Sequence, residues 1–216
     1  MHFLFDPDSK IMQFFGRFTD IVVLNAVFLL TCIPLFTIGA ANAALYDTVF
    51  RMDTEREGTL LATYFRAFRA NFKQSTAIWL LLVLFMGASY LNMVNFSNLG
   101  GTGGYVLFLF AMIIFVMLWM VFSYAFPLLS QFSNSTKETL KNALILALAH
   151  LPRSLILLIT NCFPWVLMIL NLYSFMQLSF LWTFLYFAAA AYFNSRVLNK
   201  VFKPYWEQSQ SAPDRS

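Results

Sequence analysis

The chain from Gln74 to Thr136 reads QSTAIWLLLVLFMGASYLNMVNFSNLGGTGGYVLFLFAMIIFVMLWMVFSYAFPLLSQFSNST and contains no Asp, Glu, Lys or Arg. A helix on the surface of a soluble core needs a wet face, so charged residues recur along it. A helix that crosses the hydrocarbon core of a bilayer instead needs about 20 largely apolar residues. The stretch is long enough for two such helices, and the glycines between positions 100 and 104 supply a turn. It therefore predicts a transmembrane helical hairpin.

The rest of the chain has the same character. Residues 21–46 and 154–195 are also free of charged side chains. Of the whole sequence, 60% is hydrophobic and 11% is charged, whereas a soluble domain has about 25% charged residues. The mean hydropathy is +0.68. We therefore expect one all-α integral membrane domain over residues 1–216, folded as a polytopic helical bundle surrounded by a lipid bilayer.

Apolar length and turn residues divide this bundle into elements. Five full spans are expected, over 21–38, 76–94, 105–126, 155–170 and 175–193. The segment 40–52 is shorter and predicts a helix that returns toward the side from which the first span came. Two helices are expected at the inner surface, one over 59–73 and one beginning near Thr136, after a capping-box pair at Ser135 and Glu138. We also expect a helix start at 6–9 and a polar joint at 53–58.

The cations indicate which side of the membrane is cytoplasmic, because Lys and Arg in short loops resist translocation. The two expected outer turns, at 95–104 and 171–174, carry no Lys or Arg. The cations gather instead in three places, namely 47–73, 136–153 and a basic tail over 197–216. We therefore expect a multi-pass protein of the cell membrane with a cytoplasmic C-terminus.

The N-terminal side depends on the number of crossings. With five crossings the N-terminus, including Lys10 and Arg17, would lie outside, against the charge rule. With six, the segment 40–52 returns to the cytoplasm and all the cations lie inside. We favour six, although this places Asp47 near membrane depth.

The expected helix over 59–73 is amphipathic. At about 100° per residue, its large apolar side chains share one narrow stripe, namely Leu61, Phe65, Phe68 and Phe72. Its cations form a second stripe on the adjoining face, namely Arg66, Arg69 and Lys73. Aromatic residues beside cations are typical of a helix that lies in the headgroup region of a membrane. The alternative is an ordinary cytoplasmic helix packed on the bundle.

A few polar side chains fall at membrane depth. Four of them form a candidate intramembrane polar site, namely Asn25, Asn42, Asp47 and Asn161. Polar groups in lipid must find partners, so they either hold helices together or line a path. Because no acidic relay accompanies them, we expect them to hold helices together. Asp47 has a partner in Arg51, one turn later, or it faces the bundle interior.

Residues that would carry catalysis do not cluster in the sequence. His2 and His150 are far apart, and Cys32 and Cys162 lie in apolar segments without metal-ligand spacing. The glycines at 100–104 lie between two spans rather than after a strand, so they do not predict a phosphate-binding loop. We therefore expect no enzyme, no cofactor, no metal site and no nucleic-acid partner.

Short motifs in the N-terminal half occur in a set order. They are Leu24-Asn25, Pro34, Thr37-Ile38-Gly39-Ala40, Ala44-Leu45-Tyr46, Phe65, Phe68 and Asn71-Phe72-Lys73-Gln74. With these motifs, nearly the whole chain resembles the YesL-like family of bacterial membrane proteins. That family is classed as a domain of unknown function and supplies no catalytic residues. The resemblance implies a Gram-positive bacterium in which genes for carbohydrate ABC transporters lie nearby.

These observations lead to one functional expectation and two rivals. We expect an accessory membrane component linked to carbohydrate uptake or utilisation, whose partner is a carbohydrate ABC transporter permease. The first rival is a small-molecule transporter in its own right, favoured by Pro34, Pro164 and the polar residues at depth. The second is a membrane sensor that acts through the amphipathic helix.

The topology can be tested by thiol labelling of intact cells. In a Cys32→Ser, Cys162→Ser background, Gly101→Cys should react with a membrane-impermeant thiol reagent, because its turn is expected outside. Ser135→Cys should stay unlabelled until the cells are opened. The opposite labelling pattern, detected on gels of the purified protein, would overturn the orientation.

Overall fold

The computed structural model describes residues 10–52 and 59–211, and every regular element within these residues is a helix. The helices are α1 (Lys10–Cys32), η2 (Leu35–Thr37), α2 (Ile38–Arg51), α3 (Leu60–Leu99), α4 (Gly101–Gln131), α5 (Thr136–Ala149), α6 (Leu151–Leu170), α7 (Leu172–Gln177), α8 (Ser179–Leu181), η3 (Trp182–Tyr186) and α9 (Phe187–Ser211). The helix start expected at 6–9, the polar joint at 53–58 and the end of the expected tail, 212–216, lie outside the described residues.

Within the described ranges, four helices are long and apolar enough to cross a membrane. They cover Ile11–Cys32, Leu60–Leu99, Gly101–Gln131 and Leu151–Leu170. The chain therefore has the helices of a multi-pass, all-α membrane protein. The fifth expected span, over 175–193, is not one continuous helix, because it is divided among α7, α8, η3 and the start of α9. The structure thus shows four candidate spans, and the expectation of five full spans is not met.

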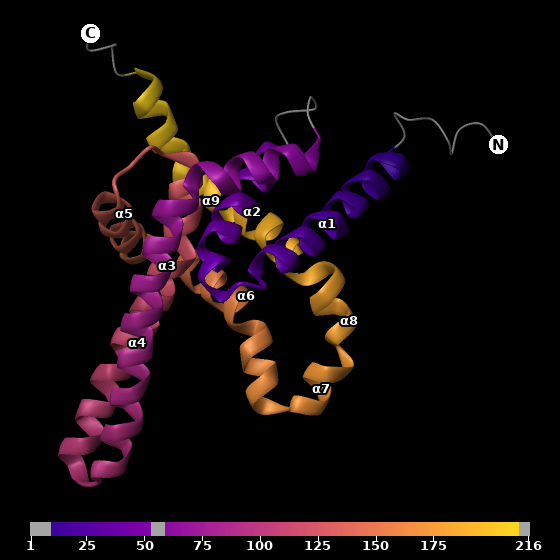
Figure 1. Ribbon diagram of the computed structural model, residues 1–216. Helices are drawn as coiled ribbons and strands as arrows, with labels where there is room; N and C mark the ends of the chain where they lie inside the picture. The colour runs from indigo at the N-terminus through magenta and orange to yellow at the C-terminus, as the bar shows by residue number, and fades with distance from the viewer. Residues whose placement is uncertain (1–9, 53–58, 212–216) are drawn as a thin grey trace.

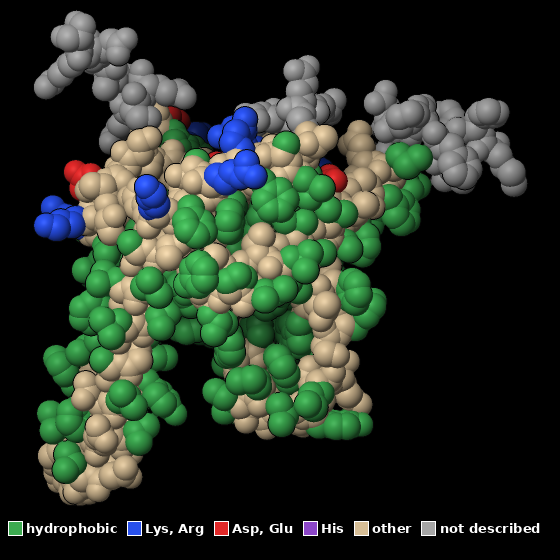
Figure 2. Space-filling view, viewed as in Figure 1, with side chains coloured by type: hydrophobic (Ala, Val, Ile, Leu, Met, Phe, Trp, Pro, Cys, Tyr) green, Lys and Arg blue, Asp and Glu red, His purple; other side chains and the backbone are tan. Residues whose placement is uncertain are grey.

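The charged residues and most helix ends lie on one side of the molecule. In Figure 1 the start of α1, the start of α3 and the end of α9 lie near the top, whereas the α3–α4 tip and α7 lie at the bottom. Figure 2 shows Lys, Arg, Asp and Glu side chains near the top and hydrophobic side chains below them. Large apolar side chains stay exposed, such as Leu84 at 67% and Ile169 at 80%. A soluble monomer rarely exposes so much apolar surface, whereas lipid covers it favourably.

Helices α1 and α2 form a hairpin that is shorter than the other two. Its turn contains Pro34 and η2, and in Figure 1 it lies well above the tips of the α3–α4 and α6–α7 segments. Residues 43–50 of α2 are all buried, so the short returning helix is present. The expected first span, 21–38, begins and ends too late in the chain, since α1 is helical from Lys10 and ends at Cys32. Helix α2 is not among the four candidate spans, so the number of crossings stays a prediction.

Helix α3 joins two elements that were expected to be separate. The amphipathic segment 60–73 and the span 76–94 are one helix, and the expected outer turn at 95–104 shrinks to Gly100 and Gly101, with φ of 65° and 66°. Only glycine adopts such φ values readily, so Thr102 is a better position than Gly101 for the labelling cysteine. The long apolar segment explains why α3 extends beyond its expected end, because a helix in lipid continues until its backbone reaches polar surroundings.

The first part of α3 runs crosswise to its long lower part in Figure 1. Two side chains at this bend donate hydrogen bonds to carbonyl groups of their own helix. Asn71 Nδ2 lies 3.2 Å from the Ala67 oxygen, and Ser75 Oγ lies 2.5 Å from the Asn71 oxygen. Side chains that bond back to the preceding turn bend helices. The bend lets one helix run along the charged side of the molecule and then pass through its apolar part.

Gly39 lies where α2 meets this bend. A Cβ at Gly39 would overlap the Ser75 carbonyl oxygen and would lie 2.6 Å from the Trp79 Cβ. Only a glycine therefore fits between the two helices. Beside this contact, Trp79 Nε1 donates a hydrogen bond of 2.8 Å to the Leu35 carbonyl, which lies in the turn before α2. The start of α2 is thus held directly against α3.

The C-terminal half departs from the expected boundaries in two places. Helix α4 continues past the expected end of its span at 126, through Pro127, and ends at Gln131. Residues 197–211 continue α9 rather than forming a separate tail, and Leu198, Val201 and Phe202 are buried in the core. A proline is tolerated within a membrane helix because neighbouring groups satisfy the freed carbonyl.

The inner-surface helix expected after Ser135 is present as α5. Its capping box is formed as predicted, because Ser135 N–H donates to Glu138 Oε2 over 2.9 Å and Glu138 N–H donates to Ser135 Oγ over 3.3 Å. The hydrogen bond from the Ser135 backbone is the main reason why the pKa of the Glu138 carboxyl is lowered. The cap therefore starts α5 directly after the link from α4.

The Gly39 contact predicts a strong effect of one added methyl group. Gly39→Ala should lower the free energy of unfolding by about 1–3 kcal/mol, because the new Cβ meets backbone atoms that cannot rotate away. Gly87→Ala is the matched control, because a Cβ at Gly87 would have nothing within 4 Å and alanine favours a helix. Unfolding of both variants in detergent, followed by circular dichroism, measures the difference. Equal stabilities would contradict the close packing.

Candidate functional site

Asn25 bridges α1 and the irregular segment before α9. Its Nδ2 donates to the carbonyl oxygens of Trp182, at 3.2 Å, and Thr183, at 2.8 Å. Its Oδ1 accepts a 2.9 Å hydrogen bond from the Ala188 N–H. These groups border η3, a π-helical turn whose wider winding leaves backbone groups without their usual partners. Asn25 is fully buried and therefore satisfies the backbone at a break in the helix.

A second polar cluster joins four helices. Asn161 of α6 donates to Ser123 Oγ of α4 over 2.9 Å. Asn194 of α9 donates to Asn161 Oδ1 over 3.2 Å and to the Tyr46 hydroxyl of α2 over 3.3 Å. The sequence pattern indicated Asn161 but missed Asn194, which lies at the very end of an uncharged stretch. Because each amide is bound to another helix, the cluster connects α2, α4, α6 and α9.

Asn42 lies beside this cluster but bonds within its own helix. Its Nδ2 donates to the Ile38 carbonyl over 3.1 Å. Together with Tyr46, Asn161 and Tyr186 it lines a cavity of about 50 Å³. Such a volume holds about one or two water molecules, whereas small-molecule sites measure about 300–1,000 Å³. The cavity is therefore too small for a sugar in this conformation.

Asp47 makes a different kind of contact from Asn25, Asn42 and Asn161, because its partner is a cation. It lies near the end of α2, where its Oδ2 accepts a 3.0 Å hydrogen bond from Arg51 Nε. The side chain of Asp47 is 8% exposed and that of Arg51 is 39% exposed. The predicted pairing is thus confirmed, and it occurs at the charged side rather than deep in the bundle.

A large pocket opens beside this ion pair. Its volume is about 670 Å³, within the range of ligand sites. It is bounded by the end of α2, the crosswise part of α3 and the link from α4 to α5. The polar residues among its lining are Asp47, Arg51, Arg66, Asn71, Gln74, Ser130, Gln131, Ser133, Asn134 and Ser135. No sequence pattern indicated this pocket, because its lining comes from three distant segments.

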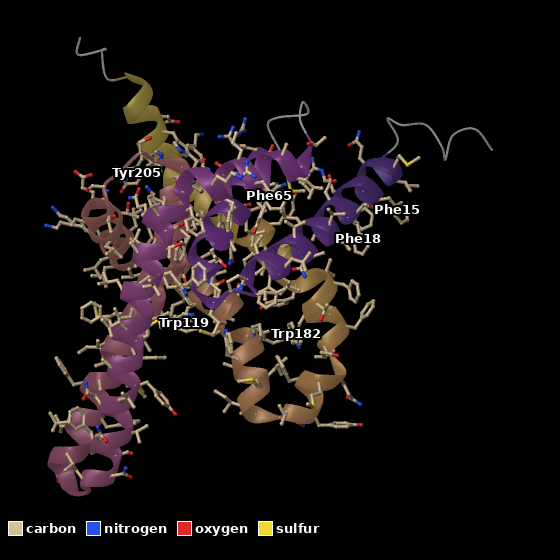
Figure 3. All side chains as sticks on the ribbon, viewed as in Figure 1. Phe15, Phe18, Phe65, Trp119, Trp182 and Tyr205 are labelled. Carbon is tan, nitrogen blue, oxygen red and sulfur yellow. The ribbon has the colours of Figure 1, made fainter. Side chains whose placement is uncertain are left out.

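The amphipathic segment of α3 presents its cations outward. Arg66, Arg69 and Lys73 are exposed, whereas Phe68 and Phe72 are half-buried and Phe65 is 41% exposed. Tyr64 and Ala67 of this segment are buried, and Tyr64 stacks on Phe68 with ring centroids 6.3 Å apart. Figure 3 shows Phe65 on the upper, charged side of the molecule, where Phe15 and Phe18 of α1 also lie. Contact of this segment with lipid headgroups stays a prediction.

Trp182 shows how the lower part of the C-terminal segment is held. In Figure 3 its side chain lies between α6 and the segment containing η3. Its ring centroid is 6.0 Å from that of Phe163 and 5.8 Å from that of Phe175, and it is 6% exposed.

Among the described residues no group of three His, Cys, Asp or Glu side chains could hold a metal ion.

The bridging role of Asn25 predicts a stability difference between two asparagines. Asn25→Leu should cost about 1–3 kcal/mol, because it leaves buried backbone groups at η3 without partners. Asn42→Leu should cost no more than about 0.5 kcal/mol, since its bond lies within one helix. Detergent unfolding of both variants measures the costs. A loss of equal size at the two positions would contradict the assigned role of Asn25.

Comparison with known proteins gives a family match for the N-terminal part of the chain. No curated protein and no solved structure matches the sequence. Residues 21–93 match the model of a family described as "Protein of unknown function, DUF624". The matched part runs from within α1 to within α3, so it contains Asn25, Asn42, Asp47 and the Gly39 contact. Residues 21–93 of this multi-pass membrane protein are thus similar to the DUF624 family, whose function is not known.

Proposed function

We propose that the protein is an accessory component of the cell membrane that binds another membrane protein through an exposed face of α3. In this proposal its charged side, with the C-terminus, faces the cytoplasm. The protein carries out no catalysis of its own. The setting, carbohydrate uptake through an ABC transporter permease, follows from the resemblance to the YesL-like proteins.

The proposal rests on the isolation of the α3–α4 hairpin. In Figure 1 its lower part stands apart from α6, α7 and α8. The two helices are held to each other there, as when Ser89 Oγ donates to the Ala111 carbonyl over 2.9 Å. Their outer faces remain exposed, with Leu91 at 62% and Phe110 at 64%. Lipid alone would cover such faces, but one of them has the composition of a helix contact.

That face lies on α3 and combines small and amide side chains. Gly87 and Ala88 are exposed, and open space surrounds the Cβ position of Gly87. Asn92 and Asn95 are exposed on the same helix, near positions one and two turns further on. Helices in membranes associate through small residues that permit close approach and through polar side chains that bond across the contact. The face therefore suits another transmembrane helix.

The transporter alternative receives less support from the geometry. The polar groups at depth bind helix to helix, and the cavity beside Asn42 and Asn161 measures only about 50 Å³. A transport path would need a site at mid-membrane that fits the solute. The accessory role requires no such site.

The proposal can be tested by complementing a gene deletion with variants in which a bulky side chain blocks one exposed helix face. We expect deletion of the gene to slow uptake of a labelled oligosaccharide only in cells that contain the neighbouring transporter. Gly87→Trp should fail to restore uptake, because the bulky side chain prevents close helix approach. Ile159→Trp, on an exposed position of α6, should restore it.

The expression of each variant in the membrane is checked by immunoblot, so that a loss of protein is not taken for a loss of function. Full restoration by Gly87→Trp would overturn the proposed face. Solute flux through the purified protein in liposomes would overturn the accessory role.

A further inference from the structure

The pocket of about 670 Å³ at the charged side is lined by residues that were expected, from the sequence, to belong to different sites. Arg66 belongs to the expected membrane-surface helix, and Asp47 to the expected intramembrane polar site. In the structure both line the same pocket, together with Arg51. The pocket is therefore a polar site built from α2, α3 and the α4–α5 link.

The walls of this pocket are held in place by hydrogen bonds. Gln74 Nε2 donates to the Asn134 carbonyl over 2.7 Å, which ties α3 to the α4–α5 link. The capping box of Ser135 and Glu138 holds the end of that link. Asp47 holds Arg51 by the 3.0 Å hydrogen bond. A preformed pocket of this kind loses little entropy when it binds a ligand.

The charge of the lining favours an anion. Arg51 and Arg66 are positive and Asp47 is negative, and no other described lining residue is charged. The described lining thus carries one net positive charge. A guanidinium group matches the oxygens of a phosphate by two parallel hydrogen bonds.

The position of the pocket fits the level of lipid headgroups. It lies along the crosswise part of α3, where exposed Phe65 and half-buried Phe68 adjoin the cations. Aromatic and basic side chains mix in this way at the boundary between hydrocarbon and water. A phosphate at this boundary can belong to a lipid or to a soluble ester.

We propose that this pocket binds an anionic phosphate group, either the phosphodiester of an acidic phospholipid headgroup or a soluble phosphate ester. Arg66 and Arg51 contact the phosphate oxygens, and the amides of Asn71 and Gln74 face the rest of the ligand. Asp47 positions Arg51 through the 3.0 Å hydrogen bond. The site is independent of the α3 face assigned to a partner helix, because it lies at the other end of that helix.

Calorimetric titration of the full-length protein in a neutral detergent tests this site. The probes are short-chain phosphatidylglycerol, short-chain phosphatidylcholine, glycerol 3-phosphate and inorganic phosphate. We expect saturable binding of at least one anionic probe and at least about tenfold weaker binding of phosphatidylcholine, whose headgroup has no net charge. Binding of phosphatidylglycerol alone would identify a lipid ligand, and equal binding of glycerol 3-phosphate would identify a soluble ester.

Two matched variants separate the pocket from general surface charge. Arg66→Gln should weaken binding about tenfold or more, since a charge-assisted hydrogen bond is removed. Arg69→Gln removes an exposed cation from the next turn of the same helix, outside the pocket, and should change the affinity less than about twofold. Both positions are exposed, so both variants should fold. Equal losses in the two variants, equal binding of phosphatidylcholine, or no saturable binding of any probe would overturn the proposal.

Discussion

Close packing of Gly39 against the bend of α3 sets the arrangement of the helices around it. The backbone of α2 approaches the Ser75 carbonyl so closely that a Cβ on Gly39 would overlap that oxygen. This approach holds the short returning helix under the crosswise part of α3. It also places the end of α2, with Asp47 and Arg51, at the edge of the charged side, where the pocket opens. One continuous helix of 40 residues thus connects a candidate anion site with a candidate partner surface.

Polar side chains in the apolar part of the molecule serve mainly to connect helices. Asn25 satisfies backbone groups at η3, where the π-helical turn interrupts the path into α9. Asn161 and Asn194 connect α4, α6, α2 and α9 through a chain of hydrogen bonds. In lipid an unpaired amide is costly, so each such group that finds a partner favours one helix arrangement over others. The bundle is therefore specified by a few polar contacts within a generally apolar interior.

Composition and local pattern were enough to predict the fold class, the apolar segments, the one-sided charges and the capping box at Ser135. These features depend on neighbours within one or two turns, and the bilayer imposes them on each segment separately. The Asp47–Arg51 pair was predictable for the same reason, since the two residues are four apart on one helix. The match of residues 21–93 to the DUF624 family model covers the region in which the motifs occur.

Tertiary packing determines where helices continue, where they break and which polar groups meet. The continuity of α3 through Lys73 and the break at η3 depend on partners far away in the chain, such as Gly39 and Asn25. Asn194 was missed because its partners, Tyr46 and Asn161, lie 148 and 33 residues away. The pocket was missed for the same reason, because distant residues acquire a shared role only when α2 packs against α3. The chemistry of each side chain can be read from the sequence, but the meeting of distant side chains follows from packing.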